Sequence, residues 1–262
     1  MRLLAAIAAV AALASPLSAA AKPKKPKAPQ TSVVTASGVT TADGASVTVT
    51  PTCPKGRIAV GGGFSTAPAD DGSTFFDMNV VFESRRADAR SWTVSAARAD
   101  QDGTPGPALP VTASVHCLPA KRAAMKGTGK QGKASKRKAK PLRVTEATAA
   151  VTAPGNTFNV AASASCPAGQ SAIGGGFSSS PVPTFTPLVA FPLVYANHRA
   201  GPGAWEVAFF NDGAPARTLT AHALCAPRVK PLLLTASAPL PPAMGGYGST
   251  TAVGASCPSG RP

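Results

Sequence analysis

The histidines and carboxylates are the side chains of this sequence that could support acid–base catalysis. The histidines are His116, His198 and His222, and most of the carboxylates stand in the first half of the chain. A general base acts only when a nucleophile or a proton donor lies within hydrogen-bonding distance of it. The sequence contains no H-E-x-x-H, no nucleophile elbow and no Ser-His-Asp order typical of a hydrolase family. These residues alone therefore predict no catalytic or metal site.

A duplicated stretch organises the chain around these residues. The motif C-P-x-G-x4-G-G-G-F-S begins at Cys53 and again at Cys166, and the two copies align without a gap as far as Trp92 and Trp205. A third copy begins at Cys257, and the sequence stops two residues after its C-P-S-G. The chain is therefore read as two full repeats followed by the start of a third.

The duplication argues against catalysis, because a duplicated enzyme should repeat its acid and its base. None of the three histidines has a histidine at the equivalent position of the other repeat. We therefore predict that the protein is not an enzyme and has no cofactor. A secreted hydrolase is the third-ranked hypothesis, and its turnover would depend on His198 or Glu83.

The glycine run superficially resembles a phosphate-binding loop. Such a loop needs Lys and Ser or Thr after its last glycine, followed by a helix, whereas Phe64 and Phe177 stand there. We expect a structural role instead, through positive φ, a bulge, or close packing under a tryptophan. The segment from Arg57 to Val60 then reads as a strand that ends in the glycines.

Two equivalent pairs are the candidate ligand-binding residues of the folded repeats. Trp92 and Trp205 could offer a platform for stacking sugars, but a single tryptophan per module more often lies in the core near a disulfide. Arg86 and Arg199 could bind an acidic ligand, but such arginines more often stack on an aromatic ring or bond a turn carbonyl. The structural alternative is favoured for both pairs.

The cysteines predict a disulfide framework. Each full repeat has one cysteine near its start and one at its end, and the duplication favours pairing Cys53 with Cys117 and Cys166 with Cys225. Sequence alone cannot choose among the three connectivities. A zinc site is the competing interpretation, although the C-x2-C pairs typical of structural zinc are absent. Cys257 is left without a partner.

Composition divides the chain into six segments. An apolar run after Arg2, followed by small residues, predicts a secretory signal peptide over residues 1–21, too short to span a membrane. A basic Pro/Lys arm (22–30) leads to the first β module (31–118), a basic disordered linker (119–143) and the second β module (144–227). Residues 228–262 are interpreted as a truncated third repeat or tail.

Each repeat has about six short alternating segments separated by turns, which predicts an all-β protein. We expect two tandem small modules, sandwich-like or barrel-like, each with an internal disulfide. Export through the signal peptide agrees with the disulfides and predicts a secreted, extracellular or periplasmic location.

The net charge of +15 is concentrated outside the repeats. The arm and the linker hold 14 of the 26 lysines and arginines. Flexible basic segments bind anionic polymers through counterion release, so cell-wall polymers, other polyanions or glycans are the expected partners, without specific nucleic-acid binding. The linker residues predicted to contact them are Lys121, Arg122, Lys126, Lys130, Lys133, Lys136, Arg137, Lys138, Lys140 and Arg143.

The set C-P-x-G-x4-G-G-G-F, then W-x-V, then a hydrophobic strand into Cys, resembles a repeat of uncharacterised secreted proteins of high-GC bacteria. The resemblance covers both full repeats and implies an exported β-rich module, with no activity attached. The sequence thus predicts an exported, non-enzymatic envelope or extracellular binding or adhesion protein. The alternative is a purely structural secreted spacer.

Overall fold

The computed structural model describes residues 31–41, 45–66, 78–99, 108–120, 141–181, 192–211 and 215–227. Within these ranges the protein is all β, with six strands in each repeat, as the sequence predicts. The predicted signal peptide, the basic arm, most of the linker and the tail lie outside the described residues. No helix long and apolar enough to cross a membrane occurs among the described residues.

The strands of the two repeats correspond one to one along the chain. The first half has β1 (Ser32–Thr40), β2 (Ser46–Val49), β3 (Arg57–Thr66), β4 (Met78–Arg86), β5 (Trp92–Ala99) and β6 (Leu109–Pro119). The second half has β7 (Thr145–Ala153), β8 (Thr157–Ser165), β9 (Gln170–Ser180), β10 (Pro192–Gly201), β11 (Ala204–Asn211) and β12 (Arg217–Pro227). Alternation drives strand formation: in β6, Leu109, Val111, Ala113, Val115 and Cys117 are buried at every second position.

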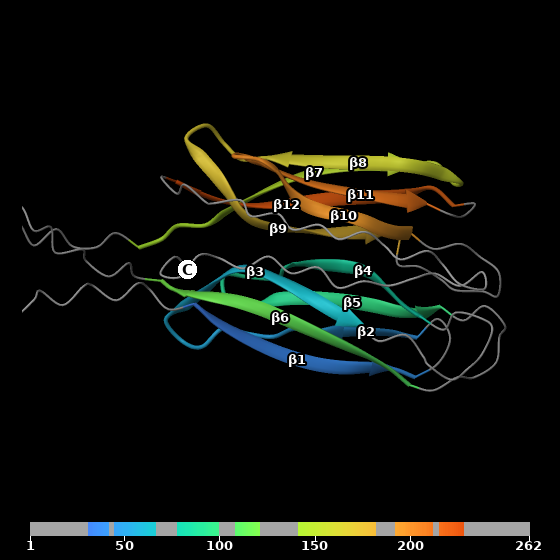
Figure 1. The fold of residues 1–262 in the computed structure, drawn as a ribbon, viewed down its shortest axis with the longest axis horizontal. Coiled ribbons are helices and arrows are strands. Elements are labelled where there is room, and N and C mark those ends of the chain that lie inside the picture. Colours follow the sequence, from blue (N-terminus) through green and yellow to red (C-terminus); the bar gives the residue numbers. More distant parts are fainter. Residues whose placement is uncertain are drawn as a thin grey trace, which may run out of the picture.

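All strand pairings are antiparallel, and the strand order is equivalent in the two halves. The first half contributes the orders β1-β6-β3 and β2-β5-β4, and the second half contributes β7-β12-β9 and β8-β11-β10. The halves are joined where β4 pairs with β9, with Glu83 opposite Ser178 and Ser84 opposite Phe177. This junction creates a six-stranded sheet in the order β2-β5-β4-β9-β12-β7. Figure 1 shows the second half lying against the first, with β9 and β4 between them.

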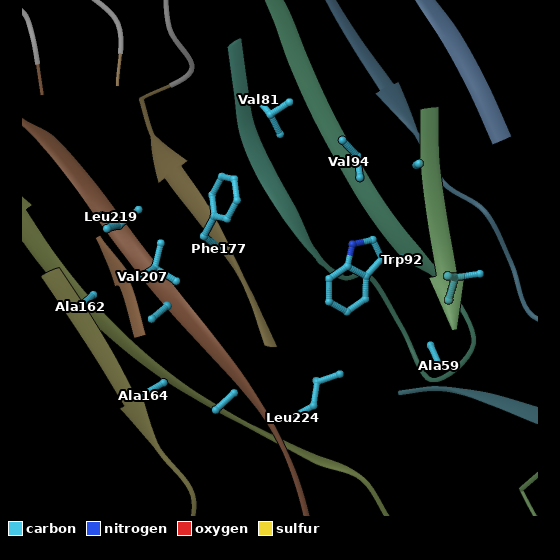
Figure 2. Close-up of a cluster of buried hydrophobic side chains, with 14 of the residues drawn as sticks. Ala59, Val81, Trp92, Val94, Ala162, Ala164, Phe177, Val207, Leu219 and Leu224 are labelled. Atoms are coloured by element: carbon cyan, nitrogen blue, oxygen red, sulfur yellow. The ribbon is translucent and has the colours of Figure 1, made fainter. Parts of the chain in front are cut away.

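One hydrophobic cluster extends through both halves. It includes Trp92 and Val94 of the first half with Phe177, Val207 and other residues of the second. Figure 2 shows the Phe177 ring between β4, which carries Val81, and the strands that carry Val207 and Leu219. Burial of these apolar groups is the main favourable contribution to folding, so the two halves stabilise one another.

The motif C-P-x-G forms the same turn in each repeat. Gly56 and Gly169 have φ of 82° and 77°, which a glycine adopts without strain. The amide of Arg57 donates to the carbonyl of Pro54 at 3.1 Å, and the equivalent bond joins Gln170 to Pro167. This is the glycine position that a type II turn requires.

The strand predicted to end in the glycines does not end there. β3 and β9 continue through the G-G-G-F-S stretch, so this prediction was wrong. The glycines remain paired with the neighbouring strand and admit a tryptophan: a Cβ on Gly62 would overlap the Trp92 ring, and one on Gly175 would overlap Trp205. The close-packing role expected for the glycines is therefore confirmed at these two positions.

Candidate functional site

A row of polar side chains crosses one face of the six-stranded sheet, with one residue on each strand. The hydroxyl oxygens of Thr48 and Ser95 are 2.9 Å apart, and the Ser95 hydroxyl donates to Glu83 Oε2 at 2.7 Å. Glu83 stands opposite Ser178 across the junction between the halves. We call this set the polar row; in strand order its members are Thr48, Ser95, Glu83, Ser178, His222 and Glu146.

The second half supplies a hydrogen-bonded triad within the polar row. Ser178 Oγ lies 3.0 Å from His222 Nε2, and His222 Nδ1 lies 2.6 Å from Glu146 Oε1. The strands fix this arrangement, because His222 on β12 stands opposite Gly176 of β9 and Thr148 of β7. Each of its partners is two residues from those positions, on the same face of the sheet.

The charge of Glu146 orients the imidazole. Its hydrogen bond with His222 lowers the pKa of this carboxyl below its usual value, against desolvation, and Arg85 and Arg86 lower the pKa further. An ionised carboxylate only accepts hydrogen bonds, so Nδ1 of His222 carries the proton. In the neutral imidazole, Nε2 is then an acceptor for the Ser178 hydroxyl.

The first half supplies the neighbouring charged groups. Arg85 Nε forms an ion pair with Glu83 Oε1 at 2.7 Å, and both side chains are partly exposed. A Cβ on Gly176 would overlap the Ser84 carbonyl and lie 3.0 Å from the Arg85 Cα, so β4 lies directly against this glycine. β4 of the first half and β12 of the second therefore flank the strand that carries Ser178.

The triad has the order of a nucleophile, a general base and a group that orients the base. Ser178 lies inside a strand, with Thr220 opposite it on one side and Glu83 on the other. The backbone of Ser178 is thus paired with a neighbouring strand on both sides. Within the part of the chain that the structure describes, no group of three His, Cys, Asp or Glu could hold a metal ion.

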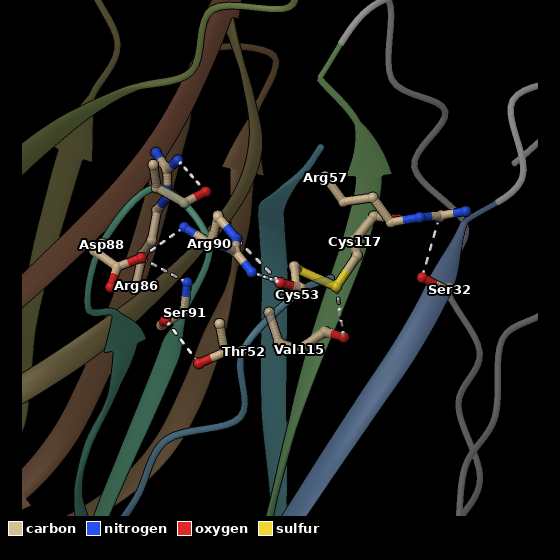
Figure 3. Close-up of a disulfide and its surroundings, with 11 residues drawn as sticks. Ser32, Thr52, Cys53, Arg57, Arg86, Asp88, Arg90, Ser91, Val115 and Cys117 are labelled. Carbon is tan, nitrogen blue, oxygen red and sulfur yellow. Dashed lines mark hydrogen bonds between the residues drawn. A yellow bond between two sulfur atoms is a disulfide. The ribbon is translucent and has the colours of Figure 1, made fainter. Parts of the chain in front are cut away.

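The two predicted disulfides are present, one in each half. Cys53 pairs with Cys117 and Cys166 with Cys225, which confirms the connectivity favoured by the duplication and excludes zinc at these cysteines. Cys257 lies outside the described residues. In Figure 3 the Cys53 carbonyl accepts from Arg90 beside the disulfide, with Arg90 Nε at 3.1 Å.

The candidate arginines both bond turn carbonyls, as their structural interpretation expects. Arg86 Nη2 donates to the Ala89 carbonyl at 3.0 Å, and Arg199 Nε donates to the Gly201 carbonyl at 2.7 Å. Burial lowers the pKa of Arg86, while Glu146 and Asp88 counteract this effect. Figure 3 places Arg86 beside the turn that Asp88 organises by accepting from the backbone amides of Arg90 and Ser91.

The candidate tryptophans differ in their surroundings. Trp92 is fully buried, and its Nε1 donates to Ser84 Oγ at 3.1 Å. Trp205 is half-buried against the core, and its Nε1 donates to Oδ1 of the exposed Asn197 at 2.7 Å. A stacking platform is therefore excluded at Trp92, which belongs to the core.

Of the ten linker residues predicted to contact polyanions, Arg143 is described and exposed. The other nine lie outside the described residues.

Sequence reasoning missed Ser178, His222 and Glu146 as a group. Their equivalents in the first repeat are Ser65, Ser114 and Val33, so the duplication gives no signal for them. Of the two hydrolase candidates, Glu83 belongs to the polar row, whereas His198 is exposed on β10. The strand order brings the triad together, and this order is not readable from local patterns.

The fold and the disulfides define an all-β protein of three antiparallel sheets with one disulfide in each half. Comparisons with protein-family models, with curated proteins and with solved structures find no match.

Proposed function

We propose that the protein is an exported cell-envelope or extracellular binding or adhesion protein whose basic segments contact anionic polymers. Its location would be secreted, extracellular or periplasmic. Two disulfides suit an oxidising compartment, and the predicted signal peptide supplies the route of export. The expected partners are cell-wall polymers, other polyanions or glycans.

The observation that carries the proposal is the separation of charge from the folded repeats. Residues 31–118 contain six bases and eight acids, and residues 144–227 contain two bases and three acids. The net charge of +15 therefore comes from the segments outside the repeats, chiefly the linker. Attachment through such segments is electrostatic, and its affinity falls steeply as salt rises.

The folded halves would give the protein a rigid surface for binding a glycan. We propose that each half is a sandwich-like or barrel-like module, because each contains two three-stranded groups of equivalent order. The partly exposed charges Glu83, Arg85 and Glu146 lie on the face with the polar row. Carboxylate and guanidinium groups bind sugar hydroxyls well, so this face is the proposed contact for a glycan.

The test is sedimentation of the mature protein with purified cell walls across a salt series. A linker variant with its ten bases replaced by Gln keeps the linker length and removes its charge. Binding lost in this variant and in high salt would assign attachment to the linker. Binding retained in both would assign it to the folded halves. An absence of saturable binding in every sample overturns the proposal and leaves the structural spacer.

The triad favours a second candidate, a secreted serine hydrolase. Ser178 Oγ would attack an ester carbonyl while its proton passes to His222 Nε2, and the leaving alcohol would take that proton. Water would then hydrolyse the acyl-serine with His222 as the base. A fluorophosphonate probe tests the candidate: labelling should disappear in Ser178→Ala and persist in Ser65→Ala, the equivalent serine of the first repeat. Equal labelling of both variants, or none in the unmodified protein, rejects it.

A further inference from the structure

The strand pairing that joins the halves occurs once, although each repeat contains both of the strand types that form it. β4 pairs with β9 at the junction, and the repeat counterparts of these strands are β10 and β3. Among the described residues β10 pairs with β11 alone and β3 with β6 alone, so each lies at the end of its sheet. An unpaired strand edge is a template for another strand.

The apolar side chains of β3 and β10 are exposed where their counterparts are buried. Phe64 is on β3, and Leu193 and Tyr195 are on β10. The pairs, exposed residue first, are Phe64 (42%) and Phe177 (1%), Leu193 (43%) and Val80 (3%), Tyr195 (58%) and Phe82 (6%). Exposed apolar groups concentrated on matched strands indicate an interaction surface.

The glycines of β3 and β9 also differ in how closely neighbouring backbone approaches them. Gly174 and Gly176 of β9 lie against the backbone of Val60 and Ser84, so that an added Cβ would overlap it. The equivalent Gly61 has no atom within 4 Å of an added Cβ, and for Gly63 the nearest atom is Ser114 Oγ at 3.6 Å. The space in front of Gly61 and Gly63 is thus open, whereas the backbone of β3 at Val60 and of β4 at Ser84 fills the equivalent space at Gly174 and Gly176.

We infer that β10 of one copy of this chain pairs with β3 of a second copy. The partner of these edges is a second copy of the chain, because β4 and β9, the repeat counterparts of β10 and β3, already pair with each other. If β10 pairs with β3 in the register that β4 has with β9, Asn197 lies opposite Phe64 of the second copy and Ala196 lies opposite its Ser65. The contact is head to tail, so two copies either close into a dimer or extend into a longer assembly.

Sedimentation velocity over a concentration series of the full mature chain tests the association. A rise of the weight-average mass to about twice the monomer mass or more is expected for a dimer or longer assembly. Phe64→Asp and Tyr195→Asp, on opposite sides of the contact, should each restore the monomer. Val33→Asp is the matched control, since Val33 is equally exposed but lies on β1. A constant monomer mass, or association unchanged by both variants, overturns the inference.

Cysteine cross-linking tests the register and the identity of the occupant. Ser65→Cys and Ala196→Cys are made in separate chains of different size, both carrying Cys257→Ser, and the two are mixed under oxidation. Paired strand positions suit a disulfide, so a mixed cross-linked dimer is expected, and Val33→Cys in place of Ser65→Cys should give none. A cross-link that forms only when both cysteines are in one chain would mean that β10 meets its own β3, which overturns the second copy as occupant.

Discussion

Phe64 and Phe177 occupy equivalent positions of the two repeats, and their rings meet edge to face with centroids 6.3 Å apart. Phe177 is buried under the first half, whereas Phe64 is exposed. Equivalent residues therefore meet at the junction without equivalent surroundings. The two repeats are equivalent in sequence, but the contact between the halves is not symmetric. The first half contributes β4 and the second contributes β9, and these strands are not repeat counterparts.

Alanine substitution in the glycine run should therefore cost much more stability in the second repeat than in the first. Gly176→Ala forces a Cβ into the Ser84 carbonyl and pushes β4 away from β9, so we expect a loss of about 3 kcal/mol in the free energy of unfolding. The equivalent Gly63→Ala has its nearest atom at 3.6 Å and should change stability by less than about 1 kcal/mol. Urea unfolding followed by tryptophan fluorescence measures both. Equal losses would mean that the glycines act through backbone entropy and not through the junction.

Local patterns are sufficient to predict the strands and the disulfides. Alternation around Val111 and Val115 marks a strand because only every second side chain faces the core. The positions of Cys53 and Cys117 at the two ends of a repeat indicate their pairing because Cys166 and Cys225 stand at the two ends of the other repeat, with separations of 64 and 59 residues. Both signals are repeated, and repetition distinguishes them from chance.

The junction and the polar row could not be predicted in this way. The pairing of Glu83 with Ser178 joins residues far apart in sequence, and no alternation within β4 or β9 specifies which outer edge is used. Ser178, His222 and Glu146 come from three strands and occur once. Only the strand order β9-β12-β7 places them side by side.

Acid should weaken the second half through Glu146. The folded pKa of Glu146 is lowered, first by its bond with His222. A carboxyl with a depressed folded pKa contributes stability above its unfolded pKa, and this contribution is lost as pH falls through the folded pKa. Because Glu146 is partly exposed, the contribution is about 1 kcal/mol or less.

The measurement is urea unfolding of the unmodified protein and of Glu146→Gln between neutral pH and pH 3. The amide still accepts from His222 but has no charge, so the variant should lose less stability in acid. Glu206→Gln on β11 is the control for removal of a carboxylate away from the polar row. If Glu146→Gln follows the unmodified protein at every pH, the carboxylate charge contributes nothing.

Arg86 should matter more for stability than Arg199. Arg86 Nη1 donates to the Val144 carbonyl at 3.4 Å and Nη2 to the Ala89 carbonyl at 3.0 Å, so it ties a turn of the first half to the segment before β7. The Arg199 bond to Gly201 stays within its own hairpin. We expect Arg86→Ala to cost about 2 kcal/mol, because both hydrogen bonds come from a charged donor and such bonds contribute more than neutral ones. Arg199→Ala should cost under about 1 kcal/mol. Thermal unfolding of the two variants compares them, and an equal cost would show that the link to Val144 carries no energy.

Removal of either disulfide should lower the midpoint of a single unfolding transition that both halves share. The cross-links close loops with sequence separations of 64 and 59 residues, and the chain-entropy model gives about 4 kcal/mol for each. The six-stranded sheet and the shared core join the halves, so neither half should melt alone. Cys53→Ala with Cys117→Ala, and Cys166→Ala with Cys225→Ala, should therefore destabilise the whole protein to a similar extent.

Single-tryptophan variants follow each half separately in this experiment. Trp205→Phe leaves Trp92 as the reporter of the first half, and Trp92→Phe leaves Trp205 as the reporter of the second. The two midpoints should coincide in each disulfide variant, as a cooperative transition requires, and Cys257→Ser should leave both unchanged. Loss of the first disulfide that moves the Trp92 transition but not that of Trp205 would show that the halves fold independently and that the β4–β9 junction is weak.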